Sequence, residues 1–527
     1  MKLLTNQSDR EEAYASLREL LEARAEWLCS EERPSREAAR LPAVGMRAAV
    51  CVRRGEWELR LAGGALHFSF WSDAGARVWR VAGWESAGDK LLLAVTRRGG
   101  GERARLELVP RASVREAAAG LRAARLAACE RLAALACGGE AGAEVLSARL
   151  SRGPRRSEPG RYARIVLSLG RRGRVAVTGP LVAVRAHEAD AVLASALAWW
   201  TRLDEQRAGG KKFEGATRLQ LVAGRELSKQ LAERLALLRE DVRARVSLFE
   251  TDGSLESLTP VETPTLESLL DAAPRARLPH APPLTDTAAR LVALAPDSVD
   301  AIRARRGETL RFHGLPFARV RRLPGGERVW FGPPGARQKL LLGEDNWPRL
   351  VKLLDELAEH RRANAPDARH SFYRAAPEAW LESVLRRDIT RLDPGLVVSP
   401  LHAQFRAPNE PAGARPVDLL ALRTDGRLVV VELKVTEDAA LPLQGADYWR
   451  RISTYHNAGH IRRARLFGDA GISGEPPLVY LVAPLLRFHR DFDTLARMIR
   501  PDIEMYRFDL NEDWRAGVRV VRRGRVV

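Results

Sequence analysis

Runs of apolar residues divide the chain into segments with strand or helix periodicity, and the clearest pattern lies near the C-terminus. Two apolar runs, Val417–Leu422 and Val429–Val435, flank the turn residues Thr424–Gly426. Such runs around a glycine-containing turn predict a β-hairpin. Three ionisable residues interrupt the runs: Asp418, Glu432 and Lys434. Because buried charge is costly unless it is paired or binds a metal, this cluster requires an ionic or catalytic explanation.

The length of the turn decides whether the two carboxylates share a face of the sheet. With a two-residue turn at Asp425–Gly426, Asp418 and Glu432 would point to opposite faces. With a three-residue loop at Thr424–Gly426, Gly426 takes the left-handed position, and Asp418 stands opposite Glu432. The Cβ atoms of opposite residues are roughly 5 Å apart, so both carboxylates can hold one cation. Glycine as the third loop residue favours this second register.

Lys434 is unusual in a chain that uses arginine for most of its cations. The 527 residues include 86 lysines and arginines, and Lys434 is the only lysine after Lys352. Lysine is a compact donor that can orient or deprotonate a water, whereas arginine is a delocalised fork that stays charged. An ion pair with Glu432 is the alternative explanation, and an isolated Glu-x-Lys tripeptide would favour it. The upstream Asp418 and the apolar flanks favour a catalytic set instead.

The order of Asp418 and then Glu432-Leu433-Lys434 resembles the motif of the PD-(D/E)xK nuclease superfamily. In that family the Asp and the Glu bind Mg²⁺ or Mn²⁺, and the Lys positions or activates the attacking water. The resemblance implies that Asp418, Glu432 and the backbone carbonyl of Leu433 are metal ligands. It also implies that Lys434 is catalytic. The resemblance covers about Ser371–Phe508, a quarter of the chain.

A helix upstream of the hairpin extends this resemblance. Members of the family usually begin with a helix that carries a metal-proximal Glu, and Ala376–Leu385 predicts such a helix, with Pro377 at its first position. Its apolar face consists of Trp380, Leu381, Val384 and Leu385. Glu378 and Glu382 lie one turn apart. We expect Glu382, which is embedded among the apolar positions, to be the catalytic, metal-binding residue; an exposed position on the helix surface is the alternative for either glutamate.

A second helix is predicted downstream, over Leu441–Trp449 and beyond. Gln444 and Tyr448 lie four residues apart, which places them on one face of that helix. This pair is similar to the Q-x-x-x-Y signature of the exonuclease-like branch of the superfamily, where it contacts nucleic acid or supports the site. Arg451 continues the same stripe, so Gln444, Tyr448 and Arg451 are expected to bind nucleic acid or to support the site. Packing of Tyr448 into the core is the alternative.

Charge and composition restrict the partners only partly. A net charge of +19 favours a polyanionic partner, although an Arg- and Ala-rich composition can also reflect genomic base bias. No segment has the form of a signal peptide or the length needed to span a bilayer. The four cysteines form no C-x-x-C pair, so neither a zinc site nor a disulfide framework is expected. We expect a cytoplasmic protein without a membrane partner.

Five segments are predicted from the element patterns. They are an α+β domain with an aromatic-rich antiparallel sheet at 1–140, an α/β domain at 141–251, a Pro-rich linker at 252–286, a small β-module with a helix at 287–365, and the nuclease-like domain at 366–527. Core packing is the favoured interpretation of the N-terminal aromatics, and a nucleic-acid platform is the alternative. The predicted fold class is α/β and α+β multidomain, and the resemblance implies a restriction-endonuclease-like α/β domain with a mixed central sheet at the C-terminus.

These features predict a Mg²⁺- or Mn²⁺-dependent nuclease with DNA as the expected substrate. Phosphodiesters resist hydrolysis because the nucleophile is weak and charge accumulates on the phosphoryl oxygens, and carboxylate-held divalent cations address both difficulties. One alternative is a catalytically silent protein that uses a nuclease-like fold to bind or scaffold nucleic acid. Another is an enzyme with a cofactor site in the β-α-β unit predicted over residues 219–249, but no glycine-rich fingerprint follows its first strand.

Overall fold

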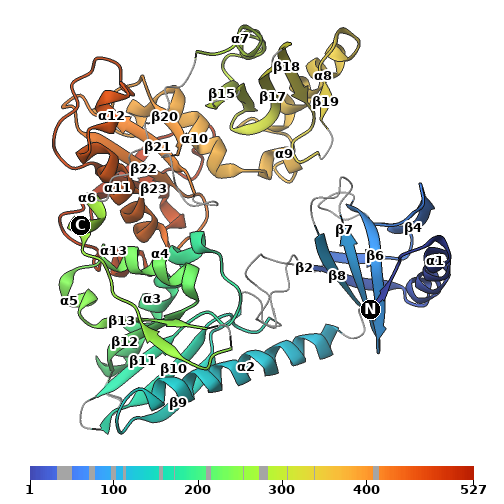
Figure 1. Ribbon diagram of the computed structural model, residues 1–527. Coiled ribbons are helices and arrows are strands. Elements are labelled where there is room, and N and C mark those ends of the chain that lie inside the picture. The colour runs from blue at the N-terminus through green and yellow to red at the C-terminus, as the bar shows by residue number, and fades with distance from the viewer. Residues whose placement is uncertain are drawn as a thin grey trace. The chain divides into compact units, whose positions relative to one another are not determined.

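The chain forms two compact units, which are described separately (Figure 1). The computed structural model describes residues 1–32, 50–70, 77–96, 103–110, 114–153, 158–170, 173–208, 215–252, 254–271, 283–304, 307–323, 325–336, 339–406 and 415–526. Unit 1 consists of Met1–Val184, Ala216–Arg225 and Phe249–Thr259, and unit 2 of Arg185–Gly215, Glu226–Leu248 and Pro260–Val527. Helices combined with antiparallel and mixed sheets confirm the predicted multidomain α/β and α+β class. The division into five segments stays a prediction.

The first sheet of unit 1 is antiparallel and has the strand order β3-β2-β8-β7-β6-β5-β4, with β1 paired to β6. Its elements are β1 (Lys2–Leu3), α1 (Gln7–Glu22), β2 (Glu26–Glu32), β3 (Val50–Arg53), β4 (Trp57–Ala62), β5 (Ala65–Phe70), β6 (Arg77–Ala87), β7 (Lys90–Thr96) and β8 (Arg103–Pro110). Trp27, Phe68, Phe70, Trp79 and Trp84 are buried together against α1. The aromatic residues therefore build a core, which confirms the favoured interpretation.

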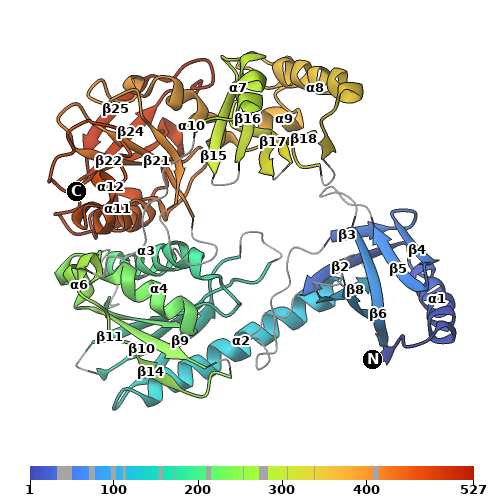
Figure 2. The ribbon, with the colours of Figure 1, turned by 45° about the horizontal axis from the view of Figure 1, so that its top comes forward.

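A second sheet has the order β14-β13-β12-β11-β10-β9, and the long helix α2 packs along it (Figure 2). Its elements are α2 (Val114–Gly138), β9 (Glu144–Leu150), β10 (Ala163–Ser168), β11 (Arg174–Thr178), β12 (Ala216–Ala223), β13 (Val246–Thr251) and β14 (Leu258–Pro260). The predicted linker at 252–286 contains β14 and the helix α6 (Leu266–Asp271). Its residues 253 and 272–282 lie outside the described residues.

Unit 2 combines helices from the middle of the chain with the C-terminal half. The mid-chain helices are α3 (Ala189–Ala208), α4 (Arg225–Leu235) and α5 (Glu240–Arg243). They belong to the segment predicted as a separate α/β domain, yet they cluster with the C-terminal part. Within the described part of the chain, no helix has the length and apolar content that crossing a bilayer requires.

A small antiparallel sheet of five strands, in the order β15-β16-β17-β18-β19, forms the β-module of unit 2. Its elements are α7 (Asp286–Ala293), β15 (Val299–Ala304), β16 (Gly307–Phe312), β17 (Leu315–Leu323), β18 (Gly326–Phe331), β19 (Leu340–Leu341) and α8 (Trp347–His360). One face packs Leu310, Val320 and Phe331 against Leu291 of α7 and Leu357 of α8. The five strands and α8 lie within the segment 287–365 that was expected to form a β-module with a helix, and the bounds of that segment stay a prediction.

The C-terminal part of unit 2 has three layers around a mixed sheet in the order β20-β21-β22-β23-β24-β25. Its elements are α9 (Ser371–Arg374), α10 (Pro377–Arg387), β20 (His402–Phe405), β21 (Val417–Leu422), β22 (Leu428–Leu433), α11 (Leu441–Asn457), α12 (His460–Arg463), β23 (Leu478–Pro484), α13 (Phe492–Ala496), β24 (Met505–Leu510) and β25 (Val520–Arg525). Strands β22, β23 and β24 run parallel to one another, and the other neighbours are antiparallel. The mixed central sheet predicted for this segment is confirmed.

Alternate residues of the hairpin β21–β22 face different helices. Leu419 and Val431 pack with Trp380 of α10, whereas Leu420 and Val430 pack with Tyr448 of α11. Successive side chains of a strand point to opposite faces, so the even-numbered residues of this hairpin face α11. This alternation determines which helix can contribute to a site on the hairpin.

Arg361, directly after α8, joins the β-module to α10. The side chain is completely buried and lies 4.6 Å over the ring of Trp380. Its guanidinium donates hydrogen bonds to the backbone carbonyl oxygens of Phe312, His313, Phe372, Ala375 and Ala376. Buried carbonyl groups cost free energy when they lack partners, so this one side chain stabilises several chain segments together.

We predict that Arg361→Met lowers the free energy of unfolding of unit 2 by about 3 kcal/mol, because it leaves several buried carbonyl oxygens without donors. Urea unfolding followed by circular dichroism measures this loss. The matched control is Arg362→Met at the neighbouring exposed position. Equal stability of the two variants would show that Arg361 is not an anchor.

Candidate active site

The hairpin adopts the register that the three-residue loop predicts. Leu419 pairs with Val431 and Leu422 with Leu428, and this register places Asp418 opposite Glu432. The amide N of Arg423 donates to the carbonyl O of Arg427 at 2.9 Å, which closes the loop. The predicted register of the hairpin is therefore confirmed.

Gly426 is required at this turn for two reasons. Its φ of 83° lies in the left-handed region that other residues rarely adopt. A Cβ atom at this position would also lie 2.5 Å from the carbonyl O of Gly471. In addition, the amide N of Ser473 donates to the carbonyl O of Gly426 at 2.8 Å. The turn that sets the register is therefore held by the neighbouring loop.

The charged residues of the hairpin lie together and are largely buried. Glu432 is 2% exposed and Lys434 8% exposed, and Lys434 Nζ lies 2.5 Å from Glu432 Oε1. Asp418 is only partly buried, and its Oδ2 accepts a hydrogen bond of 2.9 Å from the amide N of Leu433. Among the described residues, Glu432 Oε2 accepts no hydrogen bond. The site thus contains a buried carboxylate oxygen without a protein donor.

Asp418, Glu432 and Lys434 shift one another's pKa values. Burial, together with the charge of Glu432, raises the pKa of Asp418 well above its ordinary value. Burial also raises the pKa of Glu432, and Lys434 partly opposes this shift. Although burial disfavours its charged form, the carboxylates Glu432 and Asp418 hold the pKa of Lys434 above its ordinary value. A cation bound between Asp418 and Glu432 would relieve their repulsion.

These donors fit a Mg²⁺-type ion with few protein ligands. Within the described residues, no group of three or more His, Cys, Asp or Glu side chains is placed to hold a metal. Mg²⁺ is commonly held by one or two carboxylates, with water and substrate phosphate as further ligands. The facing carboxylates of Asp418 and Glu432 and the free oxygen of Glu432 meet this requirement.

Helix α11 brings Tyr448 to the same face of the hairpin. The Tyr448 side chain is buried, and burial followed by the charges of Glu432 and Asp418 raises the pKa of its phenol. Gln444 is also buried; its Nε2 lies 3.4 Å from Asp438 Oδ2, and its Oε1 has no hydrogen-bond donor among the described residues. Tyr448 packs in the core, as the alternative interpretation held, and lies within electrostatic reach of the carboxylates as well.

Arg451, the third residue of the α11 stripe, is largely buried. Its Nη1 donates to the carbonyl O of Arg415 at 2.9 Å, and its guanidinium lies 5.1 Å over the ring of Tyr448. Burial and the neighbouring Arg234 lower its pKa to about 10. In this arrangement Arg451 supports Tyr448, and its expected role in binding nucleic acid stays a prediction.

Glu382 has different partners from those expected of a metal ligand. It is buried, as predicted, but its carboxylate accepts hydrogen bonds from Arg311 of the β-module, at 2.7 and 3.4 Å, and from Gln404 Nε2 at 2.8 Å. Helix α10, which carries it, covers the face of the sheet opposite to that of Glu432. The carboxylate of Glu382 therefore joins α10 to the β-module, and its expected role in the metal site stays a prediction.

Glu378, the alternative glutamate, lies in the first turn of α10 and is exposed. Its charge is among those that act on both Glu432 and Lys434. The apolar neighbours of Glu382 in the sequence correctly predicted that this residue is buried. Helix α10, however, packs against the face of the sheet opposite to that of Glu432.

Several residues that shape the site were not found from the sequence. Arg311 and Gln404 bind Glu382 of α10, and Arg234 binds Asp447 of α11. No local sequence pattern distinguishes these residues, and the two arginines are among 86 basic residues. Asp447 could have been found, because it lies three residues after Gln444 on the same stripe of α11. Gly445 could also have been noticed, because a glycine inside a predicted helix often has a packing reason. In the structure, a Cβ atom at this position would lie 2.6 Å from Leu481 of β23.

A hollow with apolar and cationic lining residues lies on the β-module. A hollow of about 560 Å³ is lined by Thr309, Pro316, Phe317, Ala318, Arg319, Arg321, Trp330 and Lys339. Thr309, Arg319 and Trp330 lie in one row across three neighbouring strands. Arg319 and Arg321 are exposed, and Trp330 is partly exposed. We call this surface the Trp330 groove.

Comparisons with known proteins do not place the chain in a family. No protein-family model and no curated protein matches it. Among solved structures, the chain is similar to one described as "Structure of EndoMS in apo form", with 14% sequence identity over 42% of this chain and 90% of that chain. The TM-score of this match is 0.13, so the likeness carries no argument about fold or activity.

We predict that Glu382→Gln lowers the free energy of unfolding by about 2 kcal/mol, because Arg311 loses a buried charged partner. The matched change Glu378→Gln, at an exposed position one turn away, is expected to alter stability by less than about 0.5 kcal/mol. Thermal and urea unfolding of both variants test this. A stable Glu382→Gln variant would show that the contact between Glu382 and Arg311 does not anchor α10.

Proposed function

We propose that the protein is a metal-dependent nuclease that hydrolyses phosphodiester bonds of nucleic acid, with DNA as the expected substrate. The observation that carries this proposal is the pair of facing carboxylates, Asp418 and Glu432, with Lys434 paired to Glu432 beside them. Buried like charges cost free energy, and stability alone would favour apolar residues at these positions. A cation and an anionic substrate explain why the charges lie together.

In this proposal Asp418, Glu432 and the backbone carbonyl of Leu433 hold one Mg²⁺ or Mn²⁺. When bound, such an ion acidifies a water molecule and neutralises charge that accumulates on the phosphoryl oxygens. Glu432 Oε2, which has no protein donor among the described residues, is the oxygen that is open for this role.

The remaining chemistry belongs to residues of the chain itself. Lys434 Nζ keeps its proton, because the neighbouring carboxylates raise its pKa. It can therefore donate a hydrogen bond to the attacking water or to a phosphoryl oxygen, but it is not suited to remove a proton at neutral pH. Burial of Glu432 and Lys434 strengthens their electrostatic interactions with the reacting group. Gln444 and Tyr448 would support the site from α11.

The Trp330 groove supports a nucleic-acid partner. An aromatic ring bordered by exposed cations suits a single strand, since a base can stack on the ring while arginines contact phosphates. Trp330 and Arg319 are direct neighbours on adjacent strands, and Arg321 is exposed on the same groove. The net charge of +19 adds a long-range attraction for a polyanion.

The alternative is a catalytically silent protein that binds or scaffolds nucleic acid. One observation favours it: Lys434 already pairs with Glu432, as an ion pair without catalysis would require. Isothermal titration calorimetry with Mg²⁺ and Mn²⁺ separates the two, because the nuclease must bind one of these ions at Asp418 and Glu432. Absence of binding to the wild type, in the presence of nucleic acid, would favour the silent protein.

We predict that Asp418→Asn and Lys434→Ala each lower the Mg²⁺-dependent cleavage rate by at least about 100-fold. Asp418→Asn removes a negatively charged ligand, and Lys434→Ala removes the donor to the reacting group. The assay uses single-stranded, duplex and branched DNA and a matched RNA, with Mg²⁺, Mn²⁺ or EDTA.

The matched control is Lys352→Ala on α8, an exposed lysine outside the site. Circular dichroism establishes that each variant is folded. Cleavage that persists undiminished in folded Asp418→Asn and Lys434→Ala proteins refutes the proposed site.

We predict that Trp330→Ala weakens binding of a single-stranded oligonucleotide about tenfold, because stacking on an aromatic ring contributes roughly 1–3 kcal/mol per base. Fluorescence anisotropy in EDTA measures affinity without cleavage. Trp347→Ala, at an exposed tryptophan of α8 outside the groove, is the control. Equal affinities of the two variants would remove the Trp330 groove from the proposal.

A further inference from the structure

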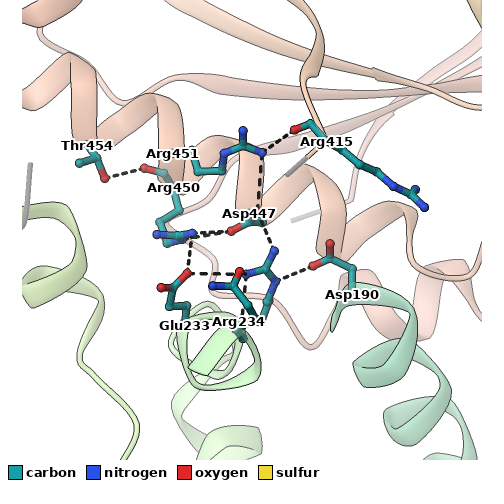
Figure 3. Close-up of polar contacts among 9 residues, drawn as sticks. Asp190, Glu233, Arg234, Arg415, Asp447, Arg450, Arg451 and Thr454 are labelled. Atoms are coloured by element: carbon teal, nitrogen blue, oxygen red, sulfur yellow. Dashed lines mark hydrogen bonds and ion pairs between the residues drawn. The ribbon is translucent and has the colours of Figure 1, made fainter. Parts of the chain in front are cut away.

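A buried ionic network joins the mid-chain helices to α11 (Figure 3). Its centre is Arg234 of α4, which is 5% exposed. Arg234 Nε donates to Asp190 Oδ1 of α3 at 2.9 Å, and Arg234 Nη2 donates to Asp447 Oδ2 of α11 at 3.0 Å. One guanidinium therefore holds carboxylates from two different helices.

The network continues to a second arginine on α11. Arg450 donates to Asp447 Oδ1 through Nε at 3.1 Å and through Nη2 at 2.7 Å. Arg450 Nη2 also donates to Glu233 Oε2 of α4 at 3.0 Å. As Figure 3 shows, α4 contributes Glu233 and Arg234 to this network, and α11 contributes Asp447 with Arg450 and Arg451. Fully paired networks of this kind specify one arrangement of the helices that carry them.

The backbone anchors the same mid-chain segment at a second place. The amide N of Arg239 donates to the carbonyl O of Met498 at 2.8 Å, and the amide N of Arg500 donates to the carbonyl O of Leu237 at 3.0 Å. The segment after α4 is thus hydrogen-bonded to the loop that follows α13. The network is therefore part of the packing of unit 2.

The network meets the candidate site at α11. Asp447 directly precedes Tyr448 and lies three residues after Gln444. The charges of Asp190 and Asp447 act on the Tyr448 phenol together with those of Glu432 and Asp418. A rotation of α11 would move Gln444 and Tyr448 relative to the hairpin, and Gly445 permits the close approach to β23 that such a rotation would disturb.

We propose that Arg234, a residue outside the nuclease-like segment, is a positioning residue that fixes the rotation of α11 and so aligns Gln444 and Tyr448 with the hairpin. The kinetic part of this inference rests on the proposed function. Arginine is required because its planar fork reaches two carboxylates in fixed directions, whereas lysine is a point charge. Apolar side chains could pack these helices equally well, but they would not set the rotation.

The test compares full-length Arg234→Met with Arg202→Met. Arg202 of α3 also binds the C-terminal part and is 41% exposed, but among the described residues its side-chain hydrogen bond goes to Asp491, at 2.9 Å, and not to α11. Hydrogen–deuterium exchange of a peptide that covers 441–457 reports the order of α11 without any cleavage. In Arg234→Met we expect about tenfold faster exchange there and unchanged exchange in β15–β19.

Kinetics supply the second readout. We expect Arg234→Met to lower kcat at least about tenfold, with the Mg²⁺ dissociation constant within about twofold of the wild type, because the metal ligands are untouched. Arg202→Met is expected to match the wild type in both. Arg234→Lys keeps the charge but loses the fork, so partial recovery of kcat and of α11 protection is expected.

Each result is decisive. Wild-type α11 exchange and kcat in Arg234→Met overturn the inference. If Arg234→Met does not fold, the Arg234→Lys variant tests the inference instead. Wild-type α11 exchange and wild-type kcat in Arg234→Lys would show that the planar guanidinium is not needed. If the wild type does not cleave nucleic acid, the proposed function fails, while the exchange of α11 still supports or overturns the positioning role by itself.

Discussion

Two carboxylates that face each other across one hairpin are the constraint on which the C-terminal part of this protein depends. Asp418 and Glu432 are opposite because a three-residue loop ends at Gly426, whose positive φ and lack of a Cβ allow the turn. A shift by one residue would move every side chain of a strand to the other face. The electrostatics of the site, including the single ammonium of Lys434, follow from this register.

Buried arginines connect the parts of unit 2. Arg361 binds backbone carbonyl oxygens from the β-module and from the start of α10. Arg311 of the β-module binds Glu382 and so holds α10. Arg234 binds Asp190 of α3 and Asp447 of α11. Each fork contacts elements that are distant in the chain, which suits arginine because it offers several donors in one plane. An arginine-rich composition is therefore used in the interior as well as for surface charge.

Prediction from sequence succeeded where the pattern is local. The hairpin, its turn and the helices α10 and α11 follow from periodicity and from glycine and proline positions. For Glu382 the local pattern predicted burial but not the partner, which is Arg311 of the β-module, because a buried position on a helix does not reveal which layer buries it. The helices α3 and α4, from the segment 141–251, cluster with the C-terminal part of the chain in unit 2. These outcomes depend on contacts between residues far apart in the chain.

The sequence by itself determined the hairpin, the order of its charged residues and the spacing of Gln444 and Tyr448, because neighbours along a chain obey fixed periods of strand and helix. Only the tertiary structure decided that Glu382 of α10 pairs with Arg311 and that Arg234 holds α11. Those choices depend on the face of the sheet that each helix covers and on partners hundreds of residues away. The physical reason is that a buried charge takes its role from the groups around it in space.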